Sequence, residues 1–198
     1  NINSVFVREF ARRIKEKSNI FFPKGSFTNH TYREQDKKLY NNIHVVQTGD
    51  IVRHIPLLRR LALASAFREK MKDLEKYDIC HIHYLDSNYG MNRSIIKNTC
   101  KHLLISFWGS DLYQTTSLNK ILQRRLLSDL DILTFSNNKF SDDFIKIFGD
   151  SYLEKFRIVR FGLAPLEILR ELEAETKDES RLSLNLPLNS IIVTCGYS

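Results

Sequence analysis

The segment HLLISFWGSDLY at residues 102–113 decides the fold. It opens with apolar residues that do not alternate with polar ones, which is typical of a strand covered on both faces of a parallel sheet. The run ends at an aromatic pair and then reaches Gly109 and Asp111. A buried strand that leads directly into a glycine turn predicts an α/β sheet whose ligand site lies where the strands end.

Similar apolar runs recur along the chain and alternate with longer amphipathic segments, as repeated strand–helix units do. Strands are expected at 19–22, 43–47, 78–84, 102–107, 131–136, 157–161 and 190–195. Helices are expected at 4–17, 56–76, 89–98, 117–128, 139–148 and 165–174. Ser117 suits an N-cap, Gly149 suits a helix end, and Pro56 and Pro165 suit first-turn positions. We therefore predict a doubly wound, Rossmann-like parallel sheet over 1–162.

The last part of the chain departs from this repeat. Residues 163–189 combine one expected helix with a polar, charged stretch. A new apolar strand at 190–195 then runs into Gly196. We predict that 1–162 form one domain, that 163–189 form an interdomain linker, and that 190–198 begin a second domain.

Composition narrows the class of protein. Hydrophobic residues make up 42% and charged residues 27% of the chain, which indicates a globular protein and not a disordered one. No apolar run reaches the roughly 20 residues that are needed to cross a bilayer. Three cysteines without paired spacing predict reduced thiols in a cytoplasmic protein; they are Cys80, Cys100 and Cys195.

The formal net charge of +7 predicts an anionic partner, such as a nucleotide phosphate, a lipid headgroup or a nucleic acid. Basic residues crowd the expected helices at 4–17 and 56–76. The second of these also carries leucines, so two interpretations stay open: a solvated helix face, or attachment to an anionic membrane surface. Nucleic acid is disfavoured, because the aromatic residues lie at strand ends while the basic ones lie on helices.

The strand-end rule also selects the candidate site residues. Gly109 permits a positive φ or a close approach of backbone to ligand. Asp111 is the candidate catalytic residue, because a carboxylate there can accept a proton or hold sugar hydroxyl groups. By spacing alone, an Asp that caps its own turn is the favoured alternative. The candidate substrate-binding residues are His83, Asp86, Trp108, Gly109, Ser136 and Gly162.

Replacing Asp111 by Asn distinguishes these two roles. A catalytic carboxylate predicts that turnover falls more than about tenfold with little loss of stability, because Asn caps a turn about as well as Asp. A pure cap predicts unchanged turnover.

His81 and His83 stand two residues apart on an expected strand, so they share one of its faces. Two such histidines can belong to a metal site, but the adjacent Cys80 points to the other face. We therefore expect no metal, one histidine packed in the core, and His83 lining the cleft. No G-x-S-x-G turn, P-loop or G-x-G-x-x-G motif occurs, which argues against a serine hydrolase and the common phosphate-binding loops.

Six short motifs follow one another: DICHIH at 78–83, LISFWGSDL at 104–112, DILTFS at 131–136, RIVRFGL at 157–163, RLSLNLP at 181–187 and IIVTCGY at 191–197. Their order resembles the N-terminal domain and domain crossing of GT-B glycosyltransferases, and most closely the bacterial family-four-type enzymes. WGSDLY at 108–113 also resembles a W-G-x-D-L-Y motif of bacterial transferases that add a sugar to a lipid-linked oligosaccharide.

The resemblance implies two Rossmann-like domains that face each other across a cleft, with the acceptor held mainly by the first and the nucleotide-sugar mainly by the second. It implies transfer of a sugar to a saccharide or lipid-linked acceptor in cell-surface polysaccharide synthesis. No cofactor and no essential metal are implied, because positive groups and helix N-termini receive the diphosphate. The first strand of the domain would precede Asn1, and a chain without a complete donor domain would be inactive.

One departure affects the site. Trp108 stands where family-four enzymes commonly carry a histidine, so the role of that histidine cannot simply pass to His83. Other functions remain open: a nucleotide-sugar epimerase or hydrolase of the same fold, or a non-catalytic basic binding domain. The expected location is the cytoplasm, with peripheral attachment to the inner face of the plasma membrane as the alternative that the basic helices raise.

Overall fold

The computed structural model describes residues 5–14, 18–23, 38–46, 48, 55–72, 74–160 and 176–191. The chain divides into two compact units, Asn1–Phe161 and Gly162–Ser198. In the second unit, the described part contains the helix α10 (Lys177–Ser183), whose N-cap is Thr176. This helix falls within the segment that the sequence assigns to a linker; that assignment stays a prediction.

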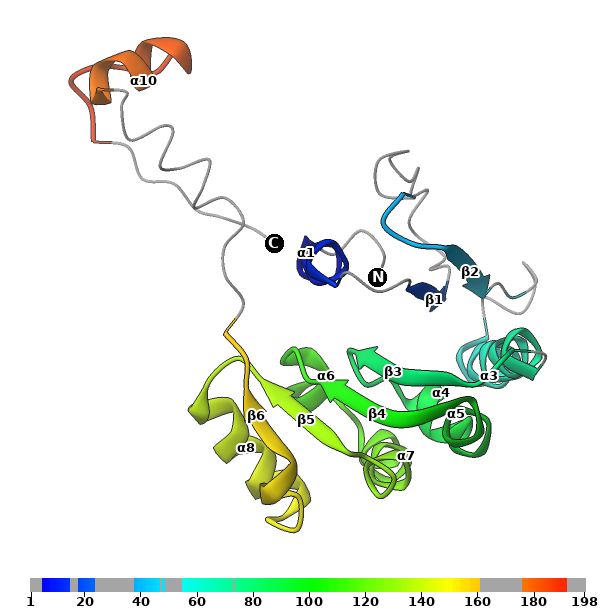
Figure 1. Ribbon diagram of the computed structural model, residues 1–198. Coiled ribbons are helices and arrows are strands. Elements are labelled where there is room, and N and C mark those ends of the chain that lie inside the picture. The colour runs from blue at the N-terminus through cyan, green and yellow to red at the C-terminus, as the bar shows by residue number, and fades with distance from the viewer. Residues whose placement is uncertain are drawn as a thin grey trace. The chain divides into compact units, whose positions relative to one another are not determined.

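The described part of the first unit forms two parallel sheets (Figure 1). The larger has the order β3-β4-β5-β6 and the smaller pairs β1 with β2. Residue pairs such as Tyr77 with Cys100 and Leu133 with Phe156 set the register of the larger sheet. The strands are β1 (Asn19–Pro23), β2 (Asn42–Val46), β3 (Tyr77–His83), β4 (Cys100–Ser106), β5 (Ile132–Phe135) and β6 (Phe156–Ile158). The α/β class with parallel strands is confirmed.

The sequence predicts one continuous sheet, whereas the described strands form two. β1 and β3 share no hydrogen-bond ladder within the described residues. Side chains bridge them instead, because the amide Nδ2 of Asn19 donates to the Tyr77 hydroxyl at 2.8 Å.

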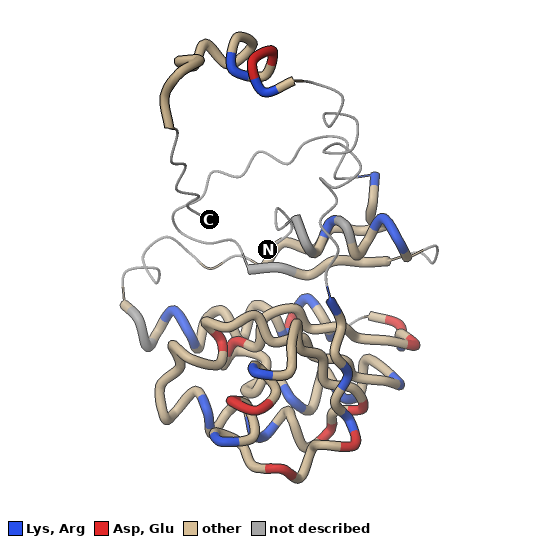
Figure 2. The backbone as a smooth tube through the Cα atoms, turned by 90° about the vertical axis from the view of Figure 1, so that its left-hand side faces the viewer, with Lys and Arg blue, Asp and Glu red and all other residues tan. Residues whose placement is uncertain are grey.

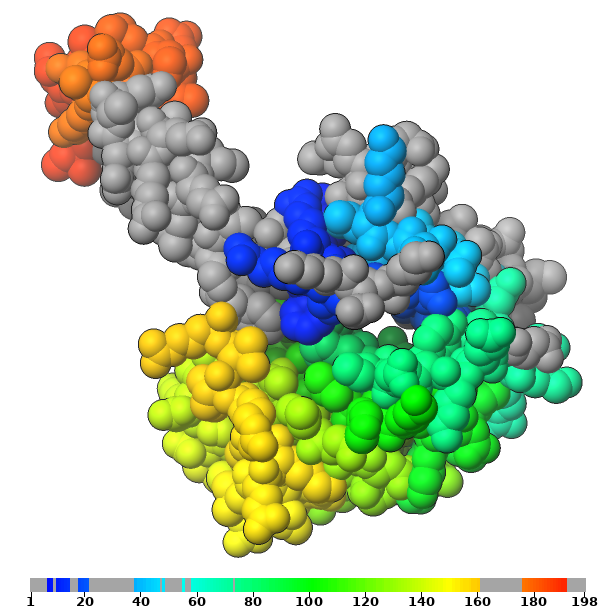
Figure 3. Space-filling model, viewed as in Figure 1, coloured from blue at the N-terminus to red at the C-terminus, as the bar shows by residue number. Residues whose placement is uncertain are grey.

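Helices cover both faces of the larger sheet. In Figure 1 and Figure 3, α1 lies on one side of it, and Figure 1 shows α5, α7 and α8 on the other. The ring of Phe10 in α1 lies edge-on to that of His81 in β3, at 4.8 Å between centroids. The helices of the first unit are α1 (Val5–Arg13), α3 (Pro56–Lys72), α4 (Ser87–Met91), α5 (Arg93–Thr99), α6 (Ser110–Tyr113), α7 (Ser117–Leu127), α8 (Asn138–Phe148) and the short 3₁₀ helix η2 (Leu153–Lys155).

Several helix boundaries differ from the sequence prediction. The helix expected at 89–98 is two helices, α4 and α5, which meet at Asn92. The buried Asn92 side chain donates to the carbonyl of Ala64 at 3.0 Å, and this contact with α3 fixes the break. Thr116, and not Ser117, caps α7, because its hydroxyl accepts the N–H of Asn119. The four-residue helix α6 was not predicted.

Other predicted boundaries are confirmed. α3 begins at Pro56 and α8 ends before Gly149, which has a φ of +91°. The expected helix at 165–174 with Pro165, and most of the strand at 190–195, lie outside the described residues.

The core explains why the predicted strands lack alternation. Leu133 and Ile105, in neighbouring strands, are fully buried. A group of aromatic rings then fills the space between the sheet and α8; it comprises Phe107, Phe135, Phe144 and Phe148. This packed layer gives the loops that leave β4 and β5 a rigid base.

Candidate functional site

The candidate site begins where β3 and β4 end, at the carboxyl edge of the larger sheet. Both strands leave the sheet near a residue with positive φ: Tyr84, at +73°, and Gly109, at +112°. Gly109 therefore adopts a positive φ, as the sequence predicts that it can. A bulky residue with positive φ is uncommon, so Tyr84 is held in place by its surroundings. Its N–H donates to the carbonyl of Ser106, which continues the β3–β4 ladder by one residue.

A buried carboxylate joins these two strand ends. Asp111 is only 2% exposed, and its Oδ2 accepts the main-chain N–H of Leu85 at 2.9 Å. Its Oδ1 accepts the N–H groups of Trp108 at 2.9 Å and Gly109 at 3.0 Å. Asp111 thus stabilises its own turn, as the capping interpretation requires, and it also ties that turn to the neighbouring loop.

The surroundings of Asp111 act on its charge in opposite directions. Burial raises the pKa of the carboxyl group, and the main-chain N–H donors work against that rise by stabilising the carboxylate. Because both oxygens face main-chain donors, the geometry makes Asp111 a positioning residue for two loops. A direct catalytic role, in which Asp111 takes a proton from the substrate, stays a prediction.

A second buried side chain reaches the same loops from α7. Gln123, 1% exposed, donates through Nε2 to the carbonyls of Leu85 and Asp111, both at 2.8 Å. Asp111 binds the N–H of Leu85 and Gln123 binds its C=O, so side chains fix both main-chain polar groups of this residue. The sequence does not predict the loop contacts of Gln123, because a glutamine within an amphipathic helix carries no signal of such a contact.

The two histidines share a face of β3, as predicted. The rings of His81 and His83 stack with their centroids 3.9 Å apart, and Phe10 lies edge-on to both. Trp108 lies beside His83 at 6.0 Å between ring centroids. The sequence predicts one histidine in the core and one lining the cleft. The structure instead buries both rings partly under the same phenylalanine.

A chain of hydroxyl groups continues from His81 across the sheet. The Nε2 of His81 and the Oγ of Ser106 are 2.7 Å apart, and this Oγ lies 2.6 Å from the Oγ1 of Thr134. The chain links β3, β4 and β5 just inside their carboxyl ends. The sequence does not predict this chain, because a serine or threonine within an apolar strand gives no sign of a hydroxyl partner in the neighbouring strand.

Each of the two histidines has a ring nitrogen that could form a further hydrogen bond. In the described part of the molecule, the buried Nδ1 atoms of His81 and His83 have no hydrogen-bond partner. Burial lowers the pKa of His81 to about 4 and that of His83 to about 3. Both rings are therefore neutral near pH 7, and a neutral imidazole nitrogen can donate or accept a hydrogen bond, depending on its tautomer.

Asp86 follows β3 and caps α4. Its Oδ1 accepts the N–H of Asn88 at 2.9 Å and the hydroxyl of Ser87 at 3.2 Å. The carboxylate therefore orders the start of a helix at the candidate site.

Two predicted residues remain, Ser136 and Gly162. Ser136 directly follows β5 and is exposed, and its Oγ accepts the side-chain amide of Asn137 at 3.3 Å. Gly162 lies outside the described residues. The structure thus brings most of the predicted set to one edge of the sheet: His83, Asp86, Trp108, Gly109, Asp111 and Ser136.

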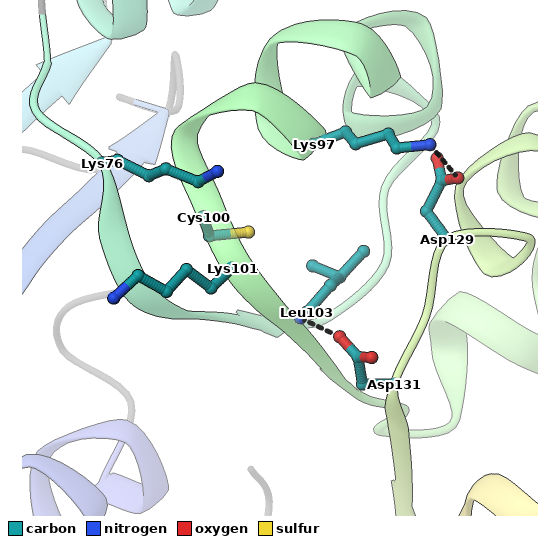
Figure 4. A pocket seen from close by; sticks show the side chains of 7 residues that line it. All are labelled: Lys76, Lys97, Cys100, Lys101, Leu103, Asp129 and Asp131. Atoms are coloured by element: carbon teal, nitrogen blue, oxygen red, sulfur yellow. Dashed lines mark hydrogen bonds and ion pairs between the residues drawn. The ribbon is translucent and has the colours of Figure 1, made fainter.

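The described part of the molecule offers two hollows as candidate binding places. A small one, about 40 Å³, lies among the loops of the carboxyl edge and includes Asp86, Asp111 and Gln123 in its lining. A larger one, about 420 Å³, lies at the amino ends of β4 and β5 (Figure 4). It is lined by Lys76, Lys97, Cys100, Lys101, Leu103, Asp129 and Asp131.

The larger hollow is a weaker candidate despite its size. Lys97 pairs with Asp129 at 3.4 Å, and Asp131 accepts the N–H of Leu103 at 2.8 Å, as Figure 4 shows. Much of its charge is therefore already engaged. Ligands of open parallel sheets bind at the carboxyl ends of the strands, so we place the candidate site at the smaller hollow.

Within the described ranges, no group of three or more His, Cys, Asp or Glu side chains could hold a metal ion. His81 and His83 supply two ligand atoms, fewer than the three protein ligands of a typical catalytic zinc site. Cys80 and Cys100 are free thiols, and Cys195 lies outside the described residues.

The fold and the strand-end site define a Rossmann-like α/β ligand-binding domain. Residues 27–138, more than half of the chain, match the glycosyl transferase 4-like family. The matched stretch includes β2 to β5 and both loops that Asp111 joins. The chain belongs to the glycosyl transferase 4-like family, and its first unit is an N-terminal domain of the GT-B glycosyltransferase type. Comparison with curated proteins gives no match.

Proposed function

We propose that the protein transfers a sugar from a nucleotide-sugar to a saccharide or lipid-linked acceptor in cell-surface polysaccharide synthesis. The observation that carries the proposal is the pair of loops after β3 and β4, which Asp111 and Gln123 hold together in a chain of the glycosyl transferase 4-like family. Fixed loops at a strand-end site position a substrate, and positioning supplies a large part of enzymatic rate enhancement.

The acceptor is proposed to bind along the ends of β3 and β4. Aromatic surfaces at the site, from His83 and Trp108, suit the apolar face of a sugar ring. The exposed hydroxyl of Ser136 and the carboxylate of Asp86 suit hydroxyl groups of the acceptor. Gly109 has no side chain, so a ligand can approach the main chain at this turn closely. Its positive φ is also one that other residues rarely adopt. Gly162 remains a proposed binding residue.

Asp111 is proposed to contribute to turnover by holding these groups in place. A carboxylate that also acts as a base would need one of its oxygens to exchange a main-chain donor for the substrate. The two roles differ in pH dependence, because only a base makes turnover follow its own titration.

The donor is proposed to bind a second domain that begins at 190–198, after a linker at 163–189. The proposal requires no cofactor and no metal, because positively charged groups and helix N-termini can receive the diphosphate leaving group. The cytoplasm, where nucleotide-sugars are made, is the proposed location.

The test is release of nucleotide by the full-length protein from a panel of nucleotide-sugars, with and without saccharide acceptors. Release that depends on the acceptor, together with a glycosylated product, supports the proposal. A changed sugar on an intact nucleotide would indicate an epimerase, and release with no acceptor dependence would indicate a hydrolase. Absence of turnover on every donor would favour a non-catalytic binding domain.

A histidine pair serves as matched variants in this assay. His83→Gln removes the ring at the site, whereas His102→Gln removes an exposed ring from the amino half of β4, where it lies 3.7 Å from Asp131. We expect His83→Gln to raise the KM for the acceptor more than about tenfold, through lost contacts in the bound state. His102→Gln should leave it unchanged. Equal effects of the two substitutions would remove His83 from the site.

A further inference from the structure

Four neighbouring helices of the first unit carry a strong charge imbalance. Together α3, α4, α5 and α7 contain ten Lys or Arg residues and a single carboxylate, that of Glu69. This imbalance exceeds the net charge of +7 of the whole chain. Figure 2 marks the Lys and Arg residues of the described backbone in blue. Such a layer attracts an anionic partner.

Part of this charge is already engaged inside the protein. Arg93 and Lys97 pair with Asp129, and Arg124 donates to the carbonyl of Ile147. The others have no carboxylate partner in the described part of the chain; on the exposed ridges of α3 and α7 these are Arg68, Lys72 and Arg125.

The same ridges expose aliphatic side chains. In α3, Leu58 is 47% and Leu61 is 54% exposed; in α7, Leu118 is 55% and Ile121 is 58% exposed. The spacing of three or four residues places each pair on one ridge of its helix, with the basic residues following toward the C-terminal end. We call the seven residues Leu58, Leu61, Arg68, Lys72, Leu118, Ile121 and Arg125 the α3–α7 surface.

Two contacts connect the helices that carry this surface. The guanidinium of Arg60 donates to the side-chain oxygen of Asn119 at 3.1 Å, which joins the first turns of α3 and α7. Between them, α4 packs against both helices. Gly90 of α4 lies so close to α7 that a Cβ there would be 2.0 Å from the carbonyl oxygen of Leu122.

The aliphatic part of the surface lies toward the candidate site. In strand–helix units of a parallel sheet, the helices run back against the strands, so their first turns lie near the strands' carboxyl ends. The first two turns of α3 and α7 contain Leu58, Leu61, Leu118 and Ile121. An apolar contact made there would bring the loops after β3 and β4 close to whatever the surface binds.

We propose that the α3–α7 surface docks the protein on an anionic lipid bilayer, with the aliphatic residues entering the interface and the basic residues facing the headgroups. The proposal does not depend on the donor or acceptor of the proposed reaction. Among the described helices, none is long and apolar enough to cross a membrane. Reversible docking of this kind combines buried aliphatic area with attraction of each cation to the headgroups.

The chemistry of the surface favours lipid over nucleic acid as the partner. Proteins that bind single-stranded nucleic acid combine cations with exposed aromatic rings on which the bases stack. The exposed apolar residues of the α3–α7 surface are leucines and an isoleucine, which have no π face to offer. Aliphatic residues beside exposed cations are the composition of interfacial membrane contacts.

The test is sedimentation of the 198-residue chain with vesicles of phosphatidylcholine alone or mixed with phosphatidylglycerol. Lys72→Gln with Arg125→Gln should weaken binding to the anionic vesicles roughly 30-fold at low salt. Leu61→Asn with Ile121→Asn should also weaken it, and this loss should persist at moderate salt, because salt screens charge and not aliphatic contact. Circular dichroism establishes that each variant is folded.

Matched variants outside the surface separate docking from general charge and apolarity. Lys76→Gln with Lys101→Gln removes two cations from the amino edge of the larger sheet, and Leu182→Asn with Leu184→Asn removes two exposed leucines from the second unit. Both controls should bind like the unaltered chain. Failure to bind anionic vesicles, equal binding to both lipids, or equal losses in surface and control variants would overturn the proposal. The proposal would also be overturned if the surface variants lost more affinity for a single-stranded oligonucleotide than for anionic vesicles.

Discussion

The carboxylate of Asp111 accepts the main-chain N–H of Leu85 at 2.9 Å, across 26 residues of sequence. This bond connects the ends of two neighbouring strands that otherwise diverge into separate helices. Its importance comes from burial, because an unsatisfied N–H at such a position costs about 1–3 kcal/mol. At the strand-end site, a buried carboxylate therefore supplies one of the two side-chain ties between the loops, and Gln123 supplies the other.

Asp111→Asn is expected to lower the free energy of unfolding by about 1–3 kcal/mol. The sequence alone predicts little loss of stability, whereas the three main-chain donors of Asp111 lead us to expect a larger one. Asn has a single acceptor oxygen. Its NH₂ group would therefore face a main-chain N–H that now donates to a carboxylate oxygen of Asp111. Urea denaturation measures the change. Asp86→Asn is the matched control and should change stability by less than about 0.5 kcal/mol, because Asn caps a helix as well as Asp. Equal stability of both variants would contradict the positioning role.

Gln123→Met tests the second tie between the loops. Methionine fills a similar volume but cannot donate, so the carbonyls of Leu85 and Asp111 would lose their buried partner. We expect a loss of about 1–3 kcal/mol in the free energy of unfolding, again by urea denaturation. Gln114→Met, at an exposed position, should stay within about 0.5 kcal/mol of the unaltered chain. A Gln123→Met protein as stable as the Gln114→Met protein would show that these bonds contribute nothing net.

Gly90→Ala tests the close approach of α4 to α7. The added methyl group would overlap the main-chain carbonyl of Leu122, and a shift of α4 away from it would disturb the N-cap that Asp86 provides. We expect a loss of about 1–3 kcal/mol or more in the free energy of unfolding, as overpacking produces. Ser94→Ala, on the exposed side of α5, controls for a methyl-sized change in a helix. A stable Gly90→Ala protein would mean that the two helices separate easily.

Sequence patterns predicted the parts of the site that depend on neighbouring residues along the chain. Apolar runs without alternation gave the strands of the larger sheet, and the spacing of Gly109 and Asp111 after one of them gave a turn with positive φ. The shared face of His81 and His83 follows from the two-residue period of any strand. Each of these features depends on residues that are close together in the sequence.

The features that the sequence did not predict arise from contacts between distant segments. Gln123 reaches loops 12 and 38 residues away, and the Ser106–Thr134 bond spans 28 residues. The break at Asn92 depends on a carbonyl of α3. A side chain in an apolar strand or an amphipathic helix looks the same in the sequence whether or not such a partner exists. Only the packing of the elements decides it.

The stacked histidines make stability depend on pH. Burial lowers the pKa of His81 to about 4 and, with the neighbouring His81 ring as a further cause, that of His83 to about 3. In the unfolded chain both rings take up protons near pH 6.5. The unfolded state therefore binds more protons than the folded state between about pH 6.5 and pH 3, so stability falls as the pH is lowered through this window and is fully present above it.

Replacing both rings should flatten this dependence. Each histidine accounts for up to roughly 3 kcal/mol between about pH 7 and the folded-state pKa, as an upper limit for a partly buried group. Acidification from about pH 7 to about pH 4.5 lowers the free energy of unfolding of the unaltered chain. In the double variant His81→Gln with His83→Gln, this fall should be smaller by roughly 2–4 kcal/mol. Urea denaturation at both pH values gives the two slopes. His102→Gln removes an exposed ring and should leave the unaltered slope. If the double variant loses as much stability on acidification as the unaltered chain, carboxylates and not these rings set the response, and the rings do not stay neutral in the folded protein.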